Sequence, residues 1–287
     1  MLEYIFFMSY QTQPTPAMEG IYQGEELLFA TASEPTPFAD RFLIDLLPSV
    51  LDNRNTSGRI AELGAGTGRD AVHFARKGLR VVAFDSCKTA RDKIRAVFQT
   101  ENLEDRLEVK GDYKNTQGIS PGSLLGVYGV SSLHYLDPIT AYELLVHYKS
   151  LLEPKGKIGL ALKTRNASWY RELLDEKGAP DATYSFNDIA QVYRHFVTHK
   201  HFHFVNNGLS SEGEMIHAFD HQHEDGSSIR RVYYTPEQLR VLASLSGFTV
   251  EKLEIVSVPN YDRLGKTEEF CYLVLEHRTL FTPNKRR

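Results

Sequence analysis

The sequence predicts an α/β fold in which helices cover both faces of a largely parallel β-sheet. Three observations predict it. Short apolar segments alternate along the chain with segments whose apolar residues recur at helical spacing. The short segments are apolar throughout, as in strands that are buried on both faces of a parallel sheet. A glycine-rich turn separates the first of these strands from the helix that follows it.

The expected elements follow one another in a regular order from residue 37 onward. The expected helices are 37–51, 69–78, 88–105, 138–156 and 236–247. The expected strands are 59–63, 80–85, 106–112, 122–133, 157–163, 249–258 and 270–278. Gly78 ends the second helix, and Pro154 and Gly156 stop the fourth. Thr235 and Pro236 begin the last helix as its N-cap and its first-turn residue.

Two segments fall outside this alternation. Residues 1–36 contain several prolines among small polar residues, and we expect them to form an arm or loose lid. Residues 164–234 are rich in histidine and aromatic residues, and they end in two strand-like runs around an Asp-Gly pair at 225–226, which is a hairpin signal. We expect a β-rich lid here, inserted into a core formed by 37–163 and 235–287.

Histidines are concentrated in this insertion, since seven of the eleven lie between 195 and 223. Those at 199, 201 and 203 alternate, as do those at 217, 221 and 223, so each set would share one face of a strand. One interpretation is a metal site. The other is a polar, aromatic-backed lid that lines a substrate site or an interface. No cysteine and no fixed zinc-finger spacing accompanies the histidines, so we predict no metal.

The composition is that of a globular protein that buries its core without disulfides. The chain has 287 residues, of which 41% are hydrophobic and 24% charged, with a net charge of -4. Cys87 and Cys271 lie in or beside apolar segments and are expected to be reduced thiols. No signal peptide and no apolar run of about 20 residues is recognisable, so we expect a cytoplasmic protein without a membrane partner. No basic field indicates nucleic acid.

The glycine-rich turn is the main indication of function. Gly64, Gly66 and Gly68 follow the first expected strand, and Asp85 ends the second. Glycines there allow a ligand to approach the backbone closely, and the next helix presents its first N–H groups to that ligand. A carboxylate at the end of the second strand suits a ribose, because it accepts hydrogen bonds from both hydroxyls. The pattern therefore indicates a nucleoside or a dinucleotide.

The spacing of the glycines distinguishes these two ligands. The dinucleotide fingerprint G-x-G-x-x-G requires a glycine at position 69, where this chain has Arg69. The turn reads E-L-G-A-G-T-G instead, with Glu62 two residues before the first glycine. A phosphate cradle for a nucleoside triphosphate is not indicated, because the Walker A lysine is missing.

These motifs, taken together, resemble the class I S-adenosylmethionine-dependent methyltransferases. They are E-L-G-A-G-T-G, Asp85, G-D at 111–112, S-S-L-H-Y-L at 131–136 and L-E-P-K-G-K-I-G-L-A-L-K at 152–163. The resemblance covers about 60–278, with an unfamiliar insertion at 164–234. It implies a Rossmann-like sheet of seven strands, mostly parallel, in which the last strand, 270–278, is antiparallel.

The resemblance also implies which residues hold the methionine part of S-adenosylmethionine. Glu62 resembles the acid that orients the methionine amino group, directly or through water. The turn beside the methionine part would consist of Gly64, Ala65, Gly66 and Gly68.

The adenosine part would lie along the neighbouring strand ends. Asp85 resembles the ribose acid, with Ser86 beside the adenine. Asp112 resembles the acid near the adenine amino group, and Tyr113 lies next to it.

Four further residues complete the expected site. Val130 and Ser131, at the end of the fourth strand, resemble the wall near the sulfonium. Tyr22, in the N-terminal arm, is expected to fold over the cofactor. His134 follows the fourth strand and is the candidate catalytic residue, either accepting a proton from a substrate or serving only as a packing histidine.

The expected activity is methyl transfer from S-adenosylmethionine to a nitrogen or oxygen of a small molecule. The aromatic residues of the insertion and arm favour a partly aromatic substrate. One alternative is a methyltransferase that acts on a protein or a nucleic acid. Another is a protein of the same fold that binds the cofactor without turnover. The sequence does not predict the substrate's identity or the oligomeric state.

Overall fold

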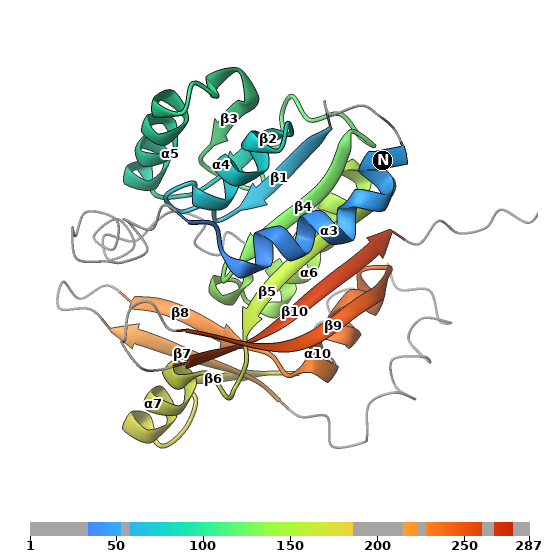
Figure 1. Cartoon of the computed structure of the whole chain (residues 1–287). Helices are drawn as coiled ribbons and strands as arrows, with labels where there is room; N and C mark the ends of the chain where they lie inside the picture. Colours follow the sequence, from blue (N-terminus) through green and yellow to red (C-terminus); the bar gives the residue numbers. More distant parts are fainter. Residues whose placement is uncertain (1–33, 53–57, 186–214, 223–227, 260–266, 278–287) are drawn as a thin grey trace, which may run out of the picture.

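The computed structural model describes residues 34–52, 58–185, 215–222, 228–259 and 267–277 (Figure 1). Its main sheet has seven strands in the order β3-β2-β1-β4-β5-β10-β9. In that order their bounds are Leu107–Lys110, Arg80–Phe84, Arg59–Leu63, Leu124–Val130, Leu152–Lys163, Thr267–His277 and Phe248–Pro259. The strands from β3 to β5 pair in parallel, whereas β10 is antiparallel to both β5 and β9. The predicted fold class and the antiparallel last strand are confirmed.

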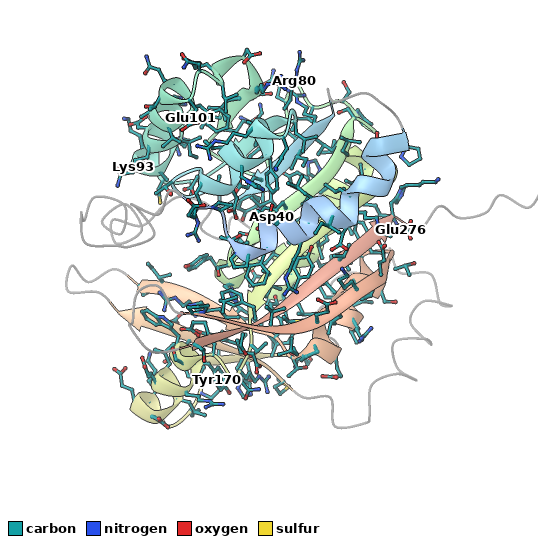
Figure 2. The ribbon with its side chains drawn as sticks, in the orientation of Figure 1. Asp40, Arg80, Lys93, Glu101, Tyr170 and Glu276 are labelled. Carbon is teal, nitrogen blue, oxygen red and sulfur yellow. The ribbon has the colours of Figure 1, made fainter. Side chains whose placement is uncertain are left out.

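Helices cover both faces of this sheet, as predicted. One face carries α3 (Pro37–Asp52), α4 (Arg69–Arg76) and α5 (Lys88–Thr100), and the other carries α6 (Pro138–Leu151) and α10 (Pro236–Leu245) (Figure 1). Each layer encloses its own cluster of buried apolar side chains. These side chains fill the space between the helices and the strands (Figure 2). The sheet is therefore a rigid platform whose strand ends are available for a site.

Several element boundaries differ from the prediction. The strand expected at 106–112 ends at Lys110. The helix expected at 138–156 ends at Leu151, and β5 begins at the next residue, so Pro154 and Gly156 lie inside the strand. The reason is that Leu152 already pairs with Leu124 of β4 before the register shifts. The residues after Leu152 bulge outward, which lets Pro154 sit exposed without giving up a ladder hydrogen bond.

The capping of α10 agrees with the sequence signals. Thr235 is its N-cap and Pro236 its first residue. The Gln238 N–H donates to Thr235 Oγ1 at 3.3 Å, and the Thr235 N–H donates to Gln238 Oε1 at 2.9 Å. This reciprocal capping box satisfies two N–H groups that the helix cannot pair internally.

The insertion forms a second, antiparallel sheet of β6 (Ala182–Tyr184), β7 (Ile216–Gln222) and β8 (Ser228–Tyr233). The two runs predicted as a hairpin are β7 and β8, which pair from His217 with Tyr233 to Gln222 with Ser228. Strand β6 and helix α7 (Ser168–Lys177) were not expected. This small sheet lies beside the carboxyl end of β5, and β8 borders the short 3-10 helix Leu133–Tyr135 that follows β4 (Figure 1).

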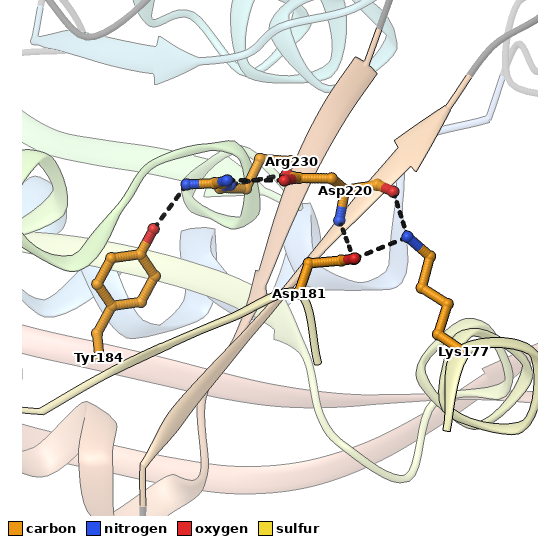
Figure 3. Close-up of polar contacts among 5 residues, drawn as sticks. All are labelled: Lys177, Asp181, Tyr184, Asp220 and Arg230. Atoms are coloured by element: carbon orange, nitrogen blue, oxygen red, sulfur yellow. Dashed lines mark hydrogen bonds and ion pairs between the residues drawn. The ribbon is translucent and has the colours of Figure 1, made fainter. Parts of the chain in front are cut away.

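A polar network fixes the small sheet to α7 (Figure 3). Arg230 on β8 donates two hydrogen bonds of 2.7 Å to the Asp220 carboxylate on β7, and a third of 2.9 Å to the Tyr184 hydroxyl on β6. Lys177 on α7 donates to Asp181 at 2.8 Å and to the Asp220 carbonyl at 2.7 Å. A bidentate arginine–carboxylate pair holds a defined geometry, so α7 and the three strands form one unit.

Two further observations concern the described residues as a whole. Cys87 and Cys271 are buried and form no disulfide. No helix among these residues has the length and apolar character needed to cross a membrane.

Candidate functional site

Most of the predicted site residues lie at one edge of the main sheet, where the parallel strands end. Glu62 is in β1, Asp85 directly follows β2, and Val130 ends β4. The strand order reverses between β1 and β4. In open α/β sheets, ligands bind at such a switch point, outside the carboxyl ends of the strands.

The glycine-rich turn after β1 has a backbone that requires glycine. Gly64 has φ of 66°, and a Cβ there would lie 2.9 Å from the Cβ of Ser132. Gly68 has φ of 84°, and a Cβ there would lie 3.1 Å from the Cγ1 of Ile94. Left-handed φ and close packing together exclude a side chain. The turn therefore lies directly against the segment that follows β4 and the helix that follows β2.

Asp85 joins the turn after β1 to the turn after β2. Its Oδ2 accepts the Gly66 N–H at 2.9 Å and its Oδ1 accepts the Cys87 N–H at 2.9 Å. The residue is buried, with 7% of its surface exposed. Both carboxylate oxygens therefore hold backbone N–H groups, one in each of the two turns.

Glu62 is a buried acid with an unsatisfied oxygen. Only 4% of the residue is exposed, and its Oε2 has no hydrogen-bond partner among the residues that the structure describes. Burial, together with the nearby charges of Asp70 and Asp85, raises the pKa of Glu62 well above its usual value. An unpaired buried carboxyl is costly, and native proteins retain such groups mainly where a ligand or a function needs them.

Asp70 is a site residue that the sequence analysis did not single out. It lies in the first turn of α4 and is 3% exposed. It accepts hydrogen bonds from the Thr36 N–H at 2.6 Å, the Thr36 hydroxyl at 2.7 Å and the Tyr128 hydroxyl at 3.0 Å. These bonds hold the residue before α3 against the glycine-rich turn. No local signal in the sequence connects Asp70 with partners so distant along the chain.

The segment after β4 is conformationally strained. Ser131 has φ of 55°, which non-glycine residues rarely adopt, and its N–H donates to the Ala161 carbonyl at 2.8 Å. The next residue, Ser132, has a buried hydroxyl for which the described residues offer no hydrogen-bond partner. Strain held by surrounding structure is concentrated at functional sites. Val130 and Ser131 directly precede Ser132, which packs against Gly64, so they lie beside the turn that contains Gly64.

The predicted adenine-side residues lie one and two strands further along the same edge. Arg91 braces this part, because its Nη1 donates to the carbonyls of Asp85 at 2.8 Å and Ser86 at 2.5 Å. Asp112 follows β3, and its Oδ1 accepts the Lys114 N–H at 2.8 Å. Tyr113 packs toward α6, and burial followed by the charge of Asp112 raises its pKa. Tyr22 lies outside the described residues.

His134 is held as a neutral imidazole. Its Nε2 accepts the Lys163 N–H at 2.6 Å, which places the ring proton on Nδ1. Burial, followed by the charges of Lys163 and Arg231, lowers the pKa of His134 to about 3. Its Nδ1 is buried and has no hydrogen-bond partner in the described part of the chain. In this geometry His134 is a hydrogen-bond donor rather than a ready proton acceptor, and its catalytic role stays a prediction.

The histidines of the insertion are only partly described. His217 forms a hydrogen bond of 2.8 Å between its Nδ1 and the Tyr170 hydroxyl. The histidines at 199, 201, 203 and 223, and the side chain of the one at 221, lie outside the description. Within the described ranges, no three His, Cys, Asp or Glu side chains are arranged to hold a metal.

The chain matches known proteins in sequence and in fold. A family model for a methyltransferase domain matches residues 37–253. An uncharacterized methyltransferase of Mycobacterium tuberculosis is 30% identical over 117 residues, which are 40% of this chain and 44% of that protein. The match thus spans less than half the length of that relative.

Two solved structures share the fold. A S-adenosylmethionine-dependent methyltransferase from Methanosarcina mazei is 14% identical with a TM-score of 0.54, covering 80% of this chain and 96% of that one. A putative S-adenosylmethionine-dependent methyltransferase from Listeria monocytogenes is 11% identical with a TM-score of 0.54, covering 85% of this chain and 100% of that one. The family match extends over most of the main sheet and the small sheet. The chain therefore belongs to the methyltransferase-domain family, as the resemblance of its motifs indicated.

Proposed function

We propose that this protein transfers a methyl group from S-adenosylmethionine to a nitrogen or oxygen of a small molecule. The observation that carries the proposal is the buried Glu62 carboxyl with its unpaired Oε2, next to a glycine-rich turn that Asp85 closes. A cationic ammonium is the group that such a carboxyl lacks. The turn at Gly64 also leaves no room for a side chain, as expected where a ligand approaches the backbone.

The residues of this edge fit the cofactor part by part. Glu62 would orient the methionine amino group, and the turn from Gly64 to Gly68 would contact the rest of the methionine part. Asp85 would accept hydrogen bonds from the ribose hydroxyls while it continues to hold the turn. The residues assigned to the adenine are Ser86, Asp112 and Tyr113. Those assigned to the sulfonium are Val130 and Ser131.

The chemistry requires little acid–base assistance from the protein. The cofactor supplies a methyl group that its sulfonium already activates. The chain's own residues have to hold the acceptor in line with that methyl group and exclude water, and positioning of this kind lowers a barrier by up to about 7–11 kcal/mol. A neutral amine acceptor needs no base before transfer. The low pKa of His134 is therefore compatible with catalysis by positioning.

The small sheet and α7 are the proposed lid and substrate-selecting unit at 164–234. They border the helix Leu133–Tyr135, which directly follows the proposed sulfonium wall. Tyr170, Phe219 and Tyr233 form an aromatic cluster there, with ring centres 5.1–6.1 Å apart. These rings are buried and pack α7 onto the small sheet, so they support the lid rather than contact an acceptor themselves.

Mass-shift screening of metabolites tests this function. The protein is incubated with whole-cell extracts, which contain metabolites, proteins and nucleic acids, and with either ordinary or methyl-labelled S-adenosylmethionine. The proposal predicts at least one small molecule that gains a methyl group and carries the label. A label found only on proteins or nucleic acids would assign a macromolecular substrate. Cofactor binding without any labelled product would indicate a protein that holds the cofactor without turnover.

A further inference from the structure

We propose that the acceptor carries an anionic group, a carboxylate or a phosphate, and that Arg231 binds this group beside the indole of Trp169. The inference rests on the proposed function, because it places the acceptor next to the methyl-transfer edge. It adds a substrate class to an activity whose acceptor is otherwise unassigned.

The Arg231 guanidinium lies over the Trp169 ring near the end of β5. Arg231 lies on β8 opposite Phe219, on the face of the small sheet that α7 covers. Its Cζ is 4.2 Å from the centre of the Trp169 ring, and Lys163 Nζ, at the end of β5, is 5.6 Å from the same centre. A guanidinium stacked on an aromatic ring keeps its N–H groups at the edge of the stack, where they can bind a planar anion in bidentate fashion.

Arg231 differs from its neighbour Arg230 in lacking an anion. Arg230 is paired with the Asp220 carboxylate through its Nε and Nη2. Arg231 forms no ion pair with any carboxylate in the described part of the chain, although it is only partly exposed. A partly buried guanidinium without an anionic partner is well suited to a carboxylate or phosphate ligand.

The second cation beside the Trp169 ring, Lys163, has an acid near it. Lys163 Nζ is 3.7 Å from Glu268 Oε1. That carboxylate also accepts the Ser168 N–H at 3.0 Å and the Ser168 hydroxyl at 2.7 Å. Lys163 thus has a carboxylate within ion-pair distance, whereas no ion pair is found for Arg231 among the described residues.

His134 adds an unsatisfied hydrogen-bond donor to this cluster. Its Nδ1 carries the ring proton, since Nε2 accepts the Lys163 N–H, and within the described ranges this Nδ1 has no partner. The ring lies 5.9 Å from that of Tyr233, on the same strand as Arg231. The charges of Lys163 and Arg231 follow burial as causes of the lowered pKa of His134. Donors from three elements thus gather beside β4, where the acceptor is expected.

The test titrates defined probes onto the whole protein saturated with S-adenosylhomocysteine. The probes are benzoate, phenyl phosphate and the neutral analogue benzamide, and binding is followed by ligand-detected NMR. The same titrations are made with Arg231→Gln and with the control Arg240→Gln, which removes the same charge from an exposed position on α10. Melting curves establish that each variant is folded.

We expect wild-type protein to bind at least one anionic probe more tightly than benzamide. Arg231→Gln should weaken that probe about tenfold or more, while Arg240→Gln should stay within about twofold. The ratio of benzoate to phenyl phosphate affinity identifies the anion. If Arg231→Gln is unfolded, wild-type salt dependence decides: added NaCl should weaken the anionic probe and leave benzamide unchanged.

Three results would overturn the inference: equal binding of benzamide and both anions, no salt dependence, or unchanged binding to a folded Arg231→Gln. Failure of the proposed function is recognised separately, because S-adenosylhomocysteine itself would then not bind. The probes are in that case titrated without it, and the same three results apply.

Discussion

Replacing Glu62 by glutamine should weaken cofactor binding. Without cofactor, the Glu62→Gln variant should be at least as stable as the wild-type protein. Glutamine keeps the shape of the side chain but cannot offer a charge to an ammonium. Loss of one charge-assisted hydrogen bond costs about 1.5–3 kcal/mol, which is roughly a 10- to 150-fold rise in Kd. Without cofactor, the substitution removes a buried carboxyl whose Oε2 has no partner, so it removes a penalty rather than a contact.

The pH dependence of stability provides a second test of the role of Glu62. Burial first, and then Asp70 and Asp85, raise the pKa of Glu62 in the folded protein above its value of about 4.3 in an unfolded chain. The folded state therefore binds the proton more tightly. Stability is lost as pH rises from the unfolded pKa toward the folded pKa, because ionisation is then penalised only in the fold. The glutamine at position 62 of the variant cannot ionise. The melting temperature of Glu62→Gln should therefore rise relative to that of the wild-type protein as pH increases across that range.

Calorimetry with S-adenosylhomocysteine and melting curves at several pH values measure both effects. Glu176→Gln is the matched control, because it makes the same chemical change at an exposed position on α7, outside the glycine-rich turn and the strand ends around it. The control should leave affinity and melting unchanged. The reasoning is refuted if Glu62→Gln binds the ligand as tightly as wild type. It is also refuted if the variant loses stability without ligand, since Glu62 would then be a structural acid.

Three further substitutions test neighbouring parts of the site. Asp85→Ala should weaken S-adenosylhomocysteine binding by roughly 10- to 150-fold in calorimetry. It should also lower the melting temperature, because the N–H groups of Gly66 and Cys87 lose their acceptor. Normal affinity and a normal melting temperature would show that Asp85 is a dispensable strand-end acid. Gly64→Ala should destabilise the protein by about 1–2 kcal/mol from its left-handed φ alone, measured by denaturant unfolding, and an unchanged midpoint would contradict the close approach to Ser132. The folded pKa of His134, about 3, lies below its unfolded value, so the stability contributed by His134 falls as pH drops below about 6.5. The free energy of unfolding of the wild-type protein should therefore fall by about 2 kcal/mol between pH 7.5 and pH 5 through this residue. His134→Gln can still accept the Lys163 N–H and should lose less stability over this range, and identical pH profiles of the two proteins would show that His134 does not titrate in this way.

Local patterns were sufficient to predict the order in which the main sheet's helices and strands follow one another along the chain, and the position of the glycine-rich turn. Each of these depends on residues close together in the chain, such as the turn from Gly64 to Gly68 and the Thr235 cap. The start of β5 could not be predicted in this way. It depends on Leu152 pairing with Leu124 across the sheet, which prevails over the breaking tendency of Pro154.

Long-range contacts account for what the sequence did not predict at the site. Asp70 acquires its role from Thr36 and Tyr128, which approach it only in the folded chain. Helix α7 and strand β6 were overlooked because their apolar residues pack mainly on the small sheet and do not continue the regular alternation. The pairing of Arg231 with Trp169 likewise depends on β8 lying beside α7.

Calorimetric titration of the purified protein with S-adenosylhomocysteine, S-adenosylmethionine and NADH tests the central claim most directly. The turn at Gly64, the unpaired Glu62 carboxyl and the presence of Arg69 in place of a third dinucleotide glycine predict micromolar binding of both sulfur nucleosides and no binding of NADH. Tight binding of NADH without any heat from S-adenosylmethionine or S-adenosylhomocysteine would contradict the account.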